Sequence, residues 1–126
     1  IVMDATDNLH ARYLINDACV KLGKPFVYGS ICEFSGQVSV FNYQNGPTYR
    51  DLFEYNDEIE NFSQPLGVIG ALPGIVGSLQ ANEAIKIILE KPGILSGKLL
   101  TIDILNNTYL TFAIRKKERG EESLFK

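Results

Sequence analysis

Two carboxylates and a carboxamide stand close together near the beginning of the chain, in the run Asp4-Ala5-Thr6-Asp7-Asn8. The run lies between a short apolar stretch and a helical pattern. In an open α/β sheet, ligands bind beyond the carboxyl ends of parallel strands, where helix N-termini also point. Oxygen ligands of this kind can hold Mg²⁺ in the company of phosphates. The structural alternative is that Asp7 or Thr6 caps the helix by accepting its unpaired N–H groups, and the spacing leaves both roles open.

Other polar side chains near this run have roles that the residues alone do not decide. Asp4 is expected to cap the end of the strand, or else to support a metal through water. Arg12, on the predicted helix, could contact a phosphate or pair with a nearby carboxylate. His10 is the single histidine of the chain, and a solvated or capping role is expected for it because metal sites of histidine need further ligands.

The two cysteines do not form a metal or disulfide pattern. Cys19 and Cys32 lie in apolar runs without a CxxC spacing, so both are expected to be small core residues. No oxidised framework is indicated, which favours a reducing cytoplasm.

The candidate site must be positioned by a strand before it and a helix after it. Ile1-Val2-Met3 is interpreted as the end of a buried strand, so we expect the chain to be a fragment whose earlier part is missing. A helix is predicted from about Asn8 to Leu22, followed by Gly23 as its C-terminal residue in the left-handed conformation. Its apolar face is predicted to comprise Ala11, Ile15, Ala18 and Leu22, with Arg12, Asn16 and Lys21 away from it.

Turn residues and periodicity predict the rest of an α/β fold. The expected elements are strands at about 26–31 and 37–41 with a turn at Gly36, a short helix after Pro47, a helix at about 73–90, and strands at about 98–104 and 108–115 around Asn106-Asn107. Gly67, Gly70, Gly74 and Gly77 recur at helical spacing and are expected to let another backbone come close. The tail from Lys116 to Lys126 is charged and expected to be disordered.

Composition excludes several classes of protein. The 126 residues carry a formal net charge of −3, and 45% of them are hydrophobic, as expected for one globular domain. No lysine and arginine stripe indicates nucleic-acid binding. The longest apolar stretch, residues 66–79, is shorter than the roughly 20 residues of a membrane-spanning helix, so no membrane partner is predicted.

The run from Asp4 to Cys19 resembles a signature of the ThiF/MoeB/HesA family, the bacterial relatives of ubiquitin-activating enzymes. Further matching segments follow in the same order: Gly23-Lys24-Pro25, 28–31, 36–41, 67–86 and 97–103. The resemblance extends over roughly residues 1–116, which is far more specific than any single motif. It implies the C-terminal part of a Rossmann-like adenylation domain, with a mixed sheet, antiparallel hairpins and two main helices, followed by a tail at 117–126.

The resemblance also implies a function. Members of this family are homodimers that use ATP and Mg²⁺ to adenylate the C-terminal glycine of a ubiquitin-fold sulfur carrier of the ThiS or MoaD type, for thiamine or molybdopterin synthesis. By the same resemblance, Asp7 looks like the magnesium-associated catalytic aspartate, and Asn8 and Arg12 look like its neighbours in the nucleotide site.

The sequence departs from the family pattern in three places. No glycine-rich phosphate loop is present, so the fragment alone is expected to be inactive. Relatives with a structural zinc hold it with two CxxC pairs, and this chain lacks them, so no zinc site is expected. Relatives with a reactive cysteine have it four residues before the glycine that matches Gly67, where this chain has Ser63, expected to be a plain loop residue.

Two other functions stay open at this level. One is a non-catalytic scaffold of the same family that keeps only dimer and carrier contacts; the other is half of an NAD-dependent oxidoreductase domain, because the same strand–helix architecture binds NAD. The acidic segment 51–60 is expected to be a solvated loop, with a path for the carrier's tail as the alternative.

Overall fold

The computed structural model describes residues 1–54 and 67–117. Its elements in chain order are β1 (Val2–Met3), α1 (Leu9–Leu22), β2 (Phe26–Cys32), β3 (Ser35–Phe41), α2 (Tyr49–Leu52), α3 (Ala71–Ile88), β4 (Lys98–Asp103) and β5 (Thr108–Ala113). These confirm the predicted α/β class and every predicted element, with ends shifted by one or two residues. Ser63 and most of the acidic segment 51–60 lie outside the described residues, as does the tail beyond Lys117.

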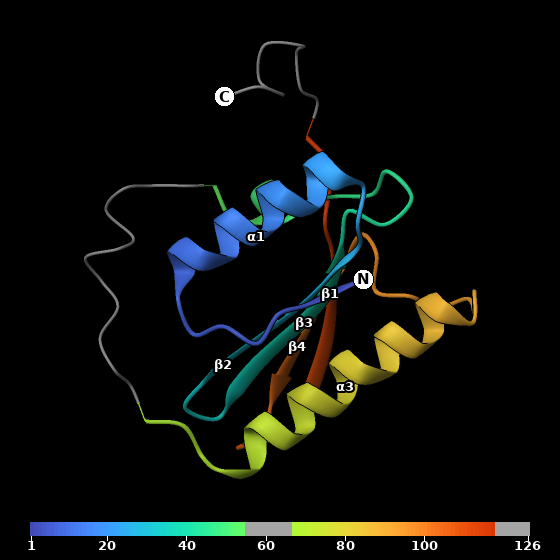
Figure 1. Ribbon diagram of the computed structural model, residues 1–126. Coiled ribbons are helices and arrows are strands. Elements are labelled where there is room, and N and C mark those ends of the chain that lie inside the picture. The colour runs from blue at the N-terminus through green and yellow to red at the C-terminus, as the bar shows by residue number, and fades with distance from the viewer. Residues whose placement is uncertain (55–66, 118–126) are drawn as a thin grey trace.

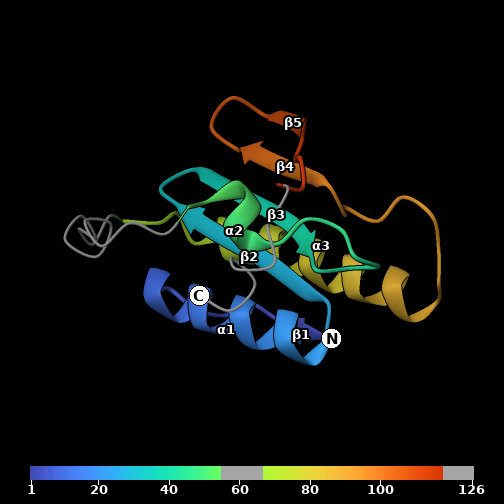
Figure 2. The ribbon, with the colours of Figure 1, turned by 90° about the horizontal axis from the view of Figure 1, so that it is seen from above.

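The five strands form one mixed sheet in the order β1-β2-β3-β4-β5. β1 and β2 are parallel, with Val2 opposite Phe26, and α1 makes the crossover between them. The other neighbours are antiparallel hairpins or antiparallel pairs. α1 and α3 lie on opposite faces of the sheet (Figure 1), and β5 forms the edge away from α1 (Figure 2). The parallel edge at β1 is the part that resembles a Rossmann sheet.

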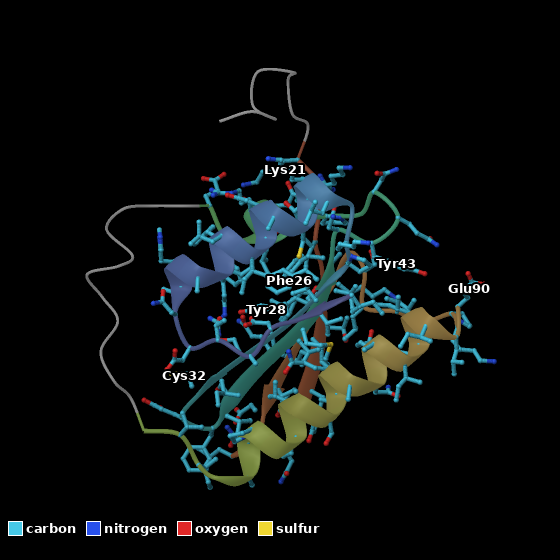
Figure 3. All side chains as sticks on the ribbon, in the orientation of Figure 1. Lys21, Phe26, Tyr28, Cys32, Tyr43 and Glu90 are labelled. Atoms are coloured by element: carbon cyan, nitrogen blue, oxygen red, sulfur yellow. The ribbon has the colours of Figure 1, made fainter. Side chains whose placement is uncertain are left out.

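Two hydrophobic cores hold the helices to the sheet. On the α1 side, an aromatic cluster joins four elements (α1, β2, β3 and α2), and its members are Tyr13, Phe26, Tyr28, Phe41 and Tyr49. The ring centroids of Tyr28 and Tyr49 are 5.4 Å apart, and those of Tyr13 and Tyr49 are 5.0 Å apart, within the range of stabilising aromatic pairs. On the α3 side, Leu72 and Val76 pack on Val38 and Ile102. Figure 3 shows Phe26 and Tyr28 on the α1 side of the sheet.

α1 begins one residue later than the predicted caps imply. Asn8 is the N-cap, with extended backbone and a side-chain oxygen that accepts from the backbone N–H of Ala11 at 3.2 Å. Neither Asp7 nor Thr6 is the residue that caps the helix, so that structural interpretation of Asp7 is wrong. Gly23 ends α1 at φ 65°, as predicted.

The predicted apolar face of α1 is also wrong. Ala18 and Leu22 are exposed, whereas Arg12 and Asn16, predicted to lie away from that face, are buried. Periodicity fails here because hydrogen bonds compensate the buried polar groups. The Asn16 Oδ1 atom accepts from the backbone N–H of Tyr49 at 2.9 Å, which fixes α2 against α1.

Glycine is required in the strands of this protein, not in its long helix. Gly36 lies within β3 and does not make the predicted turn; Glu33, at φ 54°, lies between β2 and β3. A Cβ atom at Gly36 would lie 2.6 Å from Val76 Cγ2 of α3. By contrast, Cβ atoms at Gly67, Gly70, Gly74 and Gly77 would have no neighbour within 4 Å among the described residues, so the predicted close approach at these glycines is wrong within this part of the chain.

This difference gives a stability prediction. Gly36→Ala is expected to destabilise the protein by about 1–3 kcal/mol, because the added methyl group overpacks the contact between β3 and α3. Gly67→Ala is the matched control: it adds the same group in open space outside α3, at a residue whose φ is not positive, where such a change is expected to be neutral or to stabilise by up to about 1 kcal/mol. Urea unfolding midpoints measure both. Equal midpoints for the two variants would contradict the packing argument.

Three smaller expectations have mixed outcomes. Cys19 is buried, as predicted, but Cys32 is exposed at the end of β2, so its assignment to the core is wrong. Asp51 is buried and not solvated, because its carboxylate accepts from the backbone N–H groups of Thr48 and Lys117. Lys117 is therefore tied to the domain.

Within the described ranges, neither long helix combines the length and the hydrophobicity needed to cross a bilayer.

Candidate active site at the end of β1

A cleft of about 590 Å³ opens where β1 and β2 end. Its walls are the loop from Asp4 to Asp7 together with Arg12, the last part of β2 at 29–31, and one side of α3. The sequence analysis predicts a ligand site at this end of the parallel strands, and the structure brings Asp4, Asp7 and Arg12 together around it. Asn8 is not among the lining residues, because its side chain serves as the cap of α1.

Asp4 is fully engaged by protein groups. Its Oδ1 atom accepts from the backbone N–H and the hydroxyl of Thr6, both at 2.9 Å, and its Oδ2 atom accepts from Arg12 Nε at 3.0 Å. The backbone N–H of Asp4 donates to the Val27 carbonyl at 2.8 Å. With only 4% of its surface exposed, Asp4 fixes the loop and does not present a free carboxylate to a metal.

Arg12 pairs with a nearby carboxylate, which is the second of its two predicted roles. Besides Asp4, its guanidinium donates to the carbonyls of Thr6 at 3.0 Å and Gly29 at 3.4 Å, and it lies over the Tyr28 ring at 5.5 Å. The whole residue is 7% exposed. Arg12 therefore joins the loop to β2 from the α1 side of the sheet.

The environment of Asp7 is the opposite of that of the buried Asp4 and Arg12. It is exposed and lines the cleft, on a loop in which Asp4 and Thr6 are held by hydrogen bonds. No group of three or more metal-ligating His, Cys, Asp or Glu side chains exists among the described residues. Asp7 alone therefore fits Mg²⁺ only when the ion takes its other ligands from phosphates and water, which is how Mg²⁺ commonly binds at nucleotide sites.

Gln80 is a site residue that the sequence analysis missed. It is 8% exposed, lines the cleft from α3, and donates from Nε2 to the carbonyls of Asp4 at 2.9 Å and Val27 at 3.3 Å. The only signal for it in the sequence is a carboxamide within the apolar half of a helix, which by itself suggests no partner.

A second cavity of about 450 Å³ lies on the α1 side of β2 and β3 and shares Arg12 and Ser30 with the cleft. Its aromatic walls come from α1, β2, α2 and the segment after α2, and Glu54 is also among its lining residues. The Tyr13 hydroxyl donates to the carbonyls of Phe53 and Glu54 at 3.2 and 3.3 Å. Burial raises the pKa of Tyr28 and of Tyr49 above the usual tyrosine value, and the Tyr28 hydroxyl donates to Gln37 Oε1 at 2.8 Å.

The geometry defines a mixed α/β domain with an open cleft beyond its parallel strands. The chain belongs to the ThiF family, which it matches over residues 1–123; this confirms the predicted membership. It is 49% identical to a probable molybdopterin-synthase adenylyltransferase of Pyropia yezoensis, over 90% of this chain and 31% of that protein. It is 46% identical to the adenylyltransferase and sulfurtransferase MOCS3 of Dictyostelium discoideum, over 95% of this chain and 29% of that protein. The chain thus spans about a third of the length of these relatives.

Solved structures agree on the fold. The structure of E. coli MccB with ATP superposes with a TM-score of 0.74 at 13% identity, over 91% of this chain and 37% of that chain. A structure of MccB with AMPCPP and SeMet MccA gives a TM-score of 0.75 at 12% identity. At such low identity the agreement concerns the fold alone, and it confirms the Rossmann-like architecture.

Proposed function

We propose that the protein to which this chain belongs transfers the AMP part of ATP to the C-terminal carboxylate of a ubiquitin-fold sulfur carrier. The observation that carries the proposal is an exposed carboxylate, Asp7, at a cleft beyond the parallel strands, on a loop fixed by Asp4 and Arg12. Relatives that are named adenylyltransferases at 46–49% identity support the same activity. They favour it over the NAD-dependent alternative. Their names also favour a carrier of the MoaD type over one of the ThiS type.

In this proposal Asp7 is the residue that would bind the metal, and Asp4 and Arg12 hold the loop that carries it. Asp7 would hold the magnesium that accompanies ATP, and an ion bound there would supply positive charge close to the phosphate oxygens on which negative charge develops during attack at the α-phosphorus. Asp4 and Arg12 neutralise each other and hold the loop. Arg12 is the cationic side chain among the described residues that line the cleft, and three oxygen acceptors engage it. We therefore expect other residues to supply cationic groups for the phosphates.

The second cavity is the proposed path of the carrier's tail. An extended C-terminal peptide that reaches the cleft from the α1 side passes along the aromatic rings of Tyr13 and Tyr49 and along Gln37. Since the two cavities share Arg12 and Ser30, the terminal glycine would arrive beside the nucleotide. Neutral phenols and backbone groups suit a small, uncharged tail. The acidic segment 51–60, predicted as an alternative tail path, contributes Leu52, Phe53 and Glu54 to the lining of this cavity.

The proposed activity is tested with the full-length protein by exchange of radiolabelled pyrophosphate into ATP. We expect exchange to require the carrier and to be lost when its terminal glycine is deleted. Intact-mass spectrometry should detect the carrier adenylate when pyrophosphate is removed. Exchange that ignores the carrier would contradict the proposal, and carrier binding without any exchange would favour the scaffold alternative.

The full-length protein is further proposed to be a homodimer, with α3 at the interface. The exposed residues of α3 are all uncharged: Ala71, Pro73, Gly74, Gly77, Ser78, Ala81, Asn82, Ile85 and Ile88. Ile85 and Ile88 are 53% and 67% exposed. A face without charge can meet its own copy across a twofold axis without like-charge repulsion, and the open space at Gly74 lets a second backbone come close.

We expect Ile85→Glu to convert the dimer to a monomer, because it introduces two like charges at the shared face. The control is Leu105→Glu, a substitution at a 63% exposed residue in the β4–β5 turn, which should leave the assembly intact. Light scattering after size-exclusion chromatography measures the mass at micromolar concentration. A dimer that survives Ile85→Glu would remove α3 from the interface.

The cytoplasm is the proposed location. Cys19 and Cys32 are both free thiols, which is typical of reducing compartments.

A further inference from the structure

Gln80 reaches from α3 to the loop that carries Asp7. Its Nε2 atom donates to the Asp4 carbonyl at 2.9 Å and to the Val27 carbonyl at 3.3 Å. Val27 is also the acceptor for the backbone N–H of Asp4. The carboxamide therefore bridges the first residue after β1 to β2, at the floor of the cleft.

The absence of a side chain at Gly29 makes room for this contact. A Cβ atom there would overlap the carboxamide of Gln80, with its carbon, oxygen and nitrogen as the three nearest atoms. Gly29 lies in the middle of β2, where glycine weakens a strand. A glycine at this position is explained by the close approach of the Gln80 amide to the strand.

Two helices on opposite faces of the sheet thus hold the same loop. From α1, Arg12 binds the Asp4 carboxylate and the Thr6 carbonyl; from α3, Gln80 binds the Asp4 carbonyl. Arg12 also reaches the carbonyl of Gly29, the residue against which Gln80 lies. Asp4 is consequently fixed through its side chain, its N–H and its carbonyl, three residues before the exposed Asp7.

We propose that Gln80 is a positioning residue for adenylation: by fixing the peptide of Asp4 it sets the position of Asp7 relative to the magnesium nucleotide. This inference rests on the function proposed above. Gln80 acts through the loop. The loss of its donor group should therefore affect the catalytic step and the response to magnesium more than the affinity for the carrier.

The test compares variants of the full-length protein. Gln80→Leu keeps the size of the side chain and removes the donor, and we expect kcat for exchange to fall by about 10²-fold, the scale of a 1 Å misplacement of a reacting group. The half-saturating magnesium concentration should rise, with KM for the carrier nearly unchanged. Glu83→Ala is the matched control: Glu83 is buried on α3 and accepts from the backbone N–H of Leu95, away from the loop.

A second variant separates positioning from general destabilisation. In Gln80→Glu the carboxylate faces two carbonyl oxygens, which raises its pKa, and below that pKa the protonated acid regains a donor. Its activity relative to the wild type should therefore recover as the pH is lowered, whereas that of Gln80→Leu should not. A parallel pH dependence of the two variants would contradict the proposed hydrogen bond.

Amide hydrogen exchange distinguishes failure of this inference from failure of the proposed function. The N–H of Thr6 is bonded to the Asp4 carboxylate, and it should exchange faster in Gln80→Leu but not in Glu83→Ala. If the wild-type protein has no adenylation activity, the proposed function fails and the Thr6 amide alone decides whether Gln80 holds the loop. Unchanged exchange at Thr6, or an equal loss of activity in Glu83→Ala, would overturn the inference.

Discussion

Replacing Asp7 by alanine is expected to lower carrier-dependent ATP–pyrophosphate exchange of the full-length protein by about 10²–10³-fold, the usual cost of removing one electrostatic group that acts at the transition state. Asp7 is exposed, so the same change should alter the free energy of unfolding by no more than about 0.5 kcal/mol. The measurements are initial exchange rates over a range of magnesium concentrations and a urea unfolding curve. A large catalytic effect with a small effect on stability distinguishes a ligand from a structural residue.

Ser63→Ala is the control for this prediction. Ser63 lies outside the described residues, and its hydroxyl is scarcely ionised near neutral pH, so adenylation should proceed nearly unchanged without it. Full exchange activity in the Asp7→Ala protein would remove Asp7 from the proposed site. Magnesium dependence that stays the same in the variant would likewise assign the metal to other residues.

The local sequence signals predicted the elements well because they depend on neighbouring residues. The helix that ends at Gly23, the β2–β3 hairpin and the Asn106-Asn107 turn follow from glycine, alternation and turn chemistry respectively, and Asn107 has a positive φ of 54° in the turn. The glycines show the limit of such reasoning. Spacing alone could not reveal that Gly29 and Gly36, in the strands, lie directly against side chains of α3. The regularly spaced glycines of α3 itself have open space beside them.

The sequence predicted where the cleft lies, but only partly which role each residue around it has. The strand–loop–helix pattern correctly located a cleft beside Asp7. It could not separate Asp4 from Asp7, because two carboxylates three residues apart differ only in what tertiary structure brings to them. Arg12 reaches Asp4 across the turn, and Gln80 reaches it from 76 positions along the chain. Contacts at that separation have no signature in a single sequence.

The pair formed by Arg12 and Asp4 should contribute more to stability than any exposed pair in the protein. Arg12→Ala is expected to destabilise the fold by about 3–5 kcal/mol, because it leaves the Asp4 carboxylate buried without its counter-charge. The side chains of Arg12 and Asp4 are 8% and 0% exposed. Thermal or urea unfolding of the variant measures the loss, and adding Asp4→Asn should recover part of it by removing the unpaired charge.

Arg50 provides a control of the same chemistry in a different environment. It pairs with Asp17 at 2.8 Å, but the two side chains are 36% and 49% exposed, so this pair is expected to contribute only about 0–1 kcal/mol. Arg50→Ala also removes a contact with the Tyr13 ring at 5.0 Å. This extra loss of stability makes the difference between the two variants smaller, so a larger loss in Arg12→Ala is all the more informative. Equal losses for Arg12→Ala and Arg50→Ala would mean that burial is not what makes the first pair important. The loop bearing Asp7 would then depend chiefly on Gln80 and the backbone, and the active-site geometry would be set from the α3 side of the sheet.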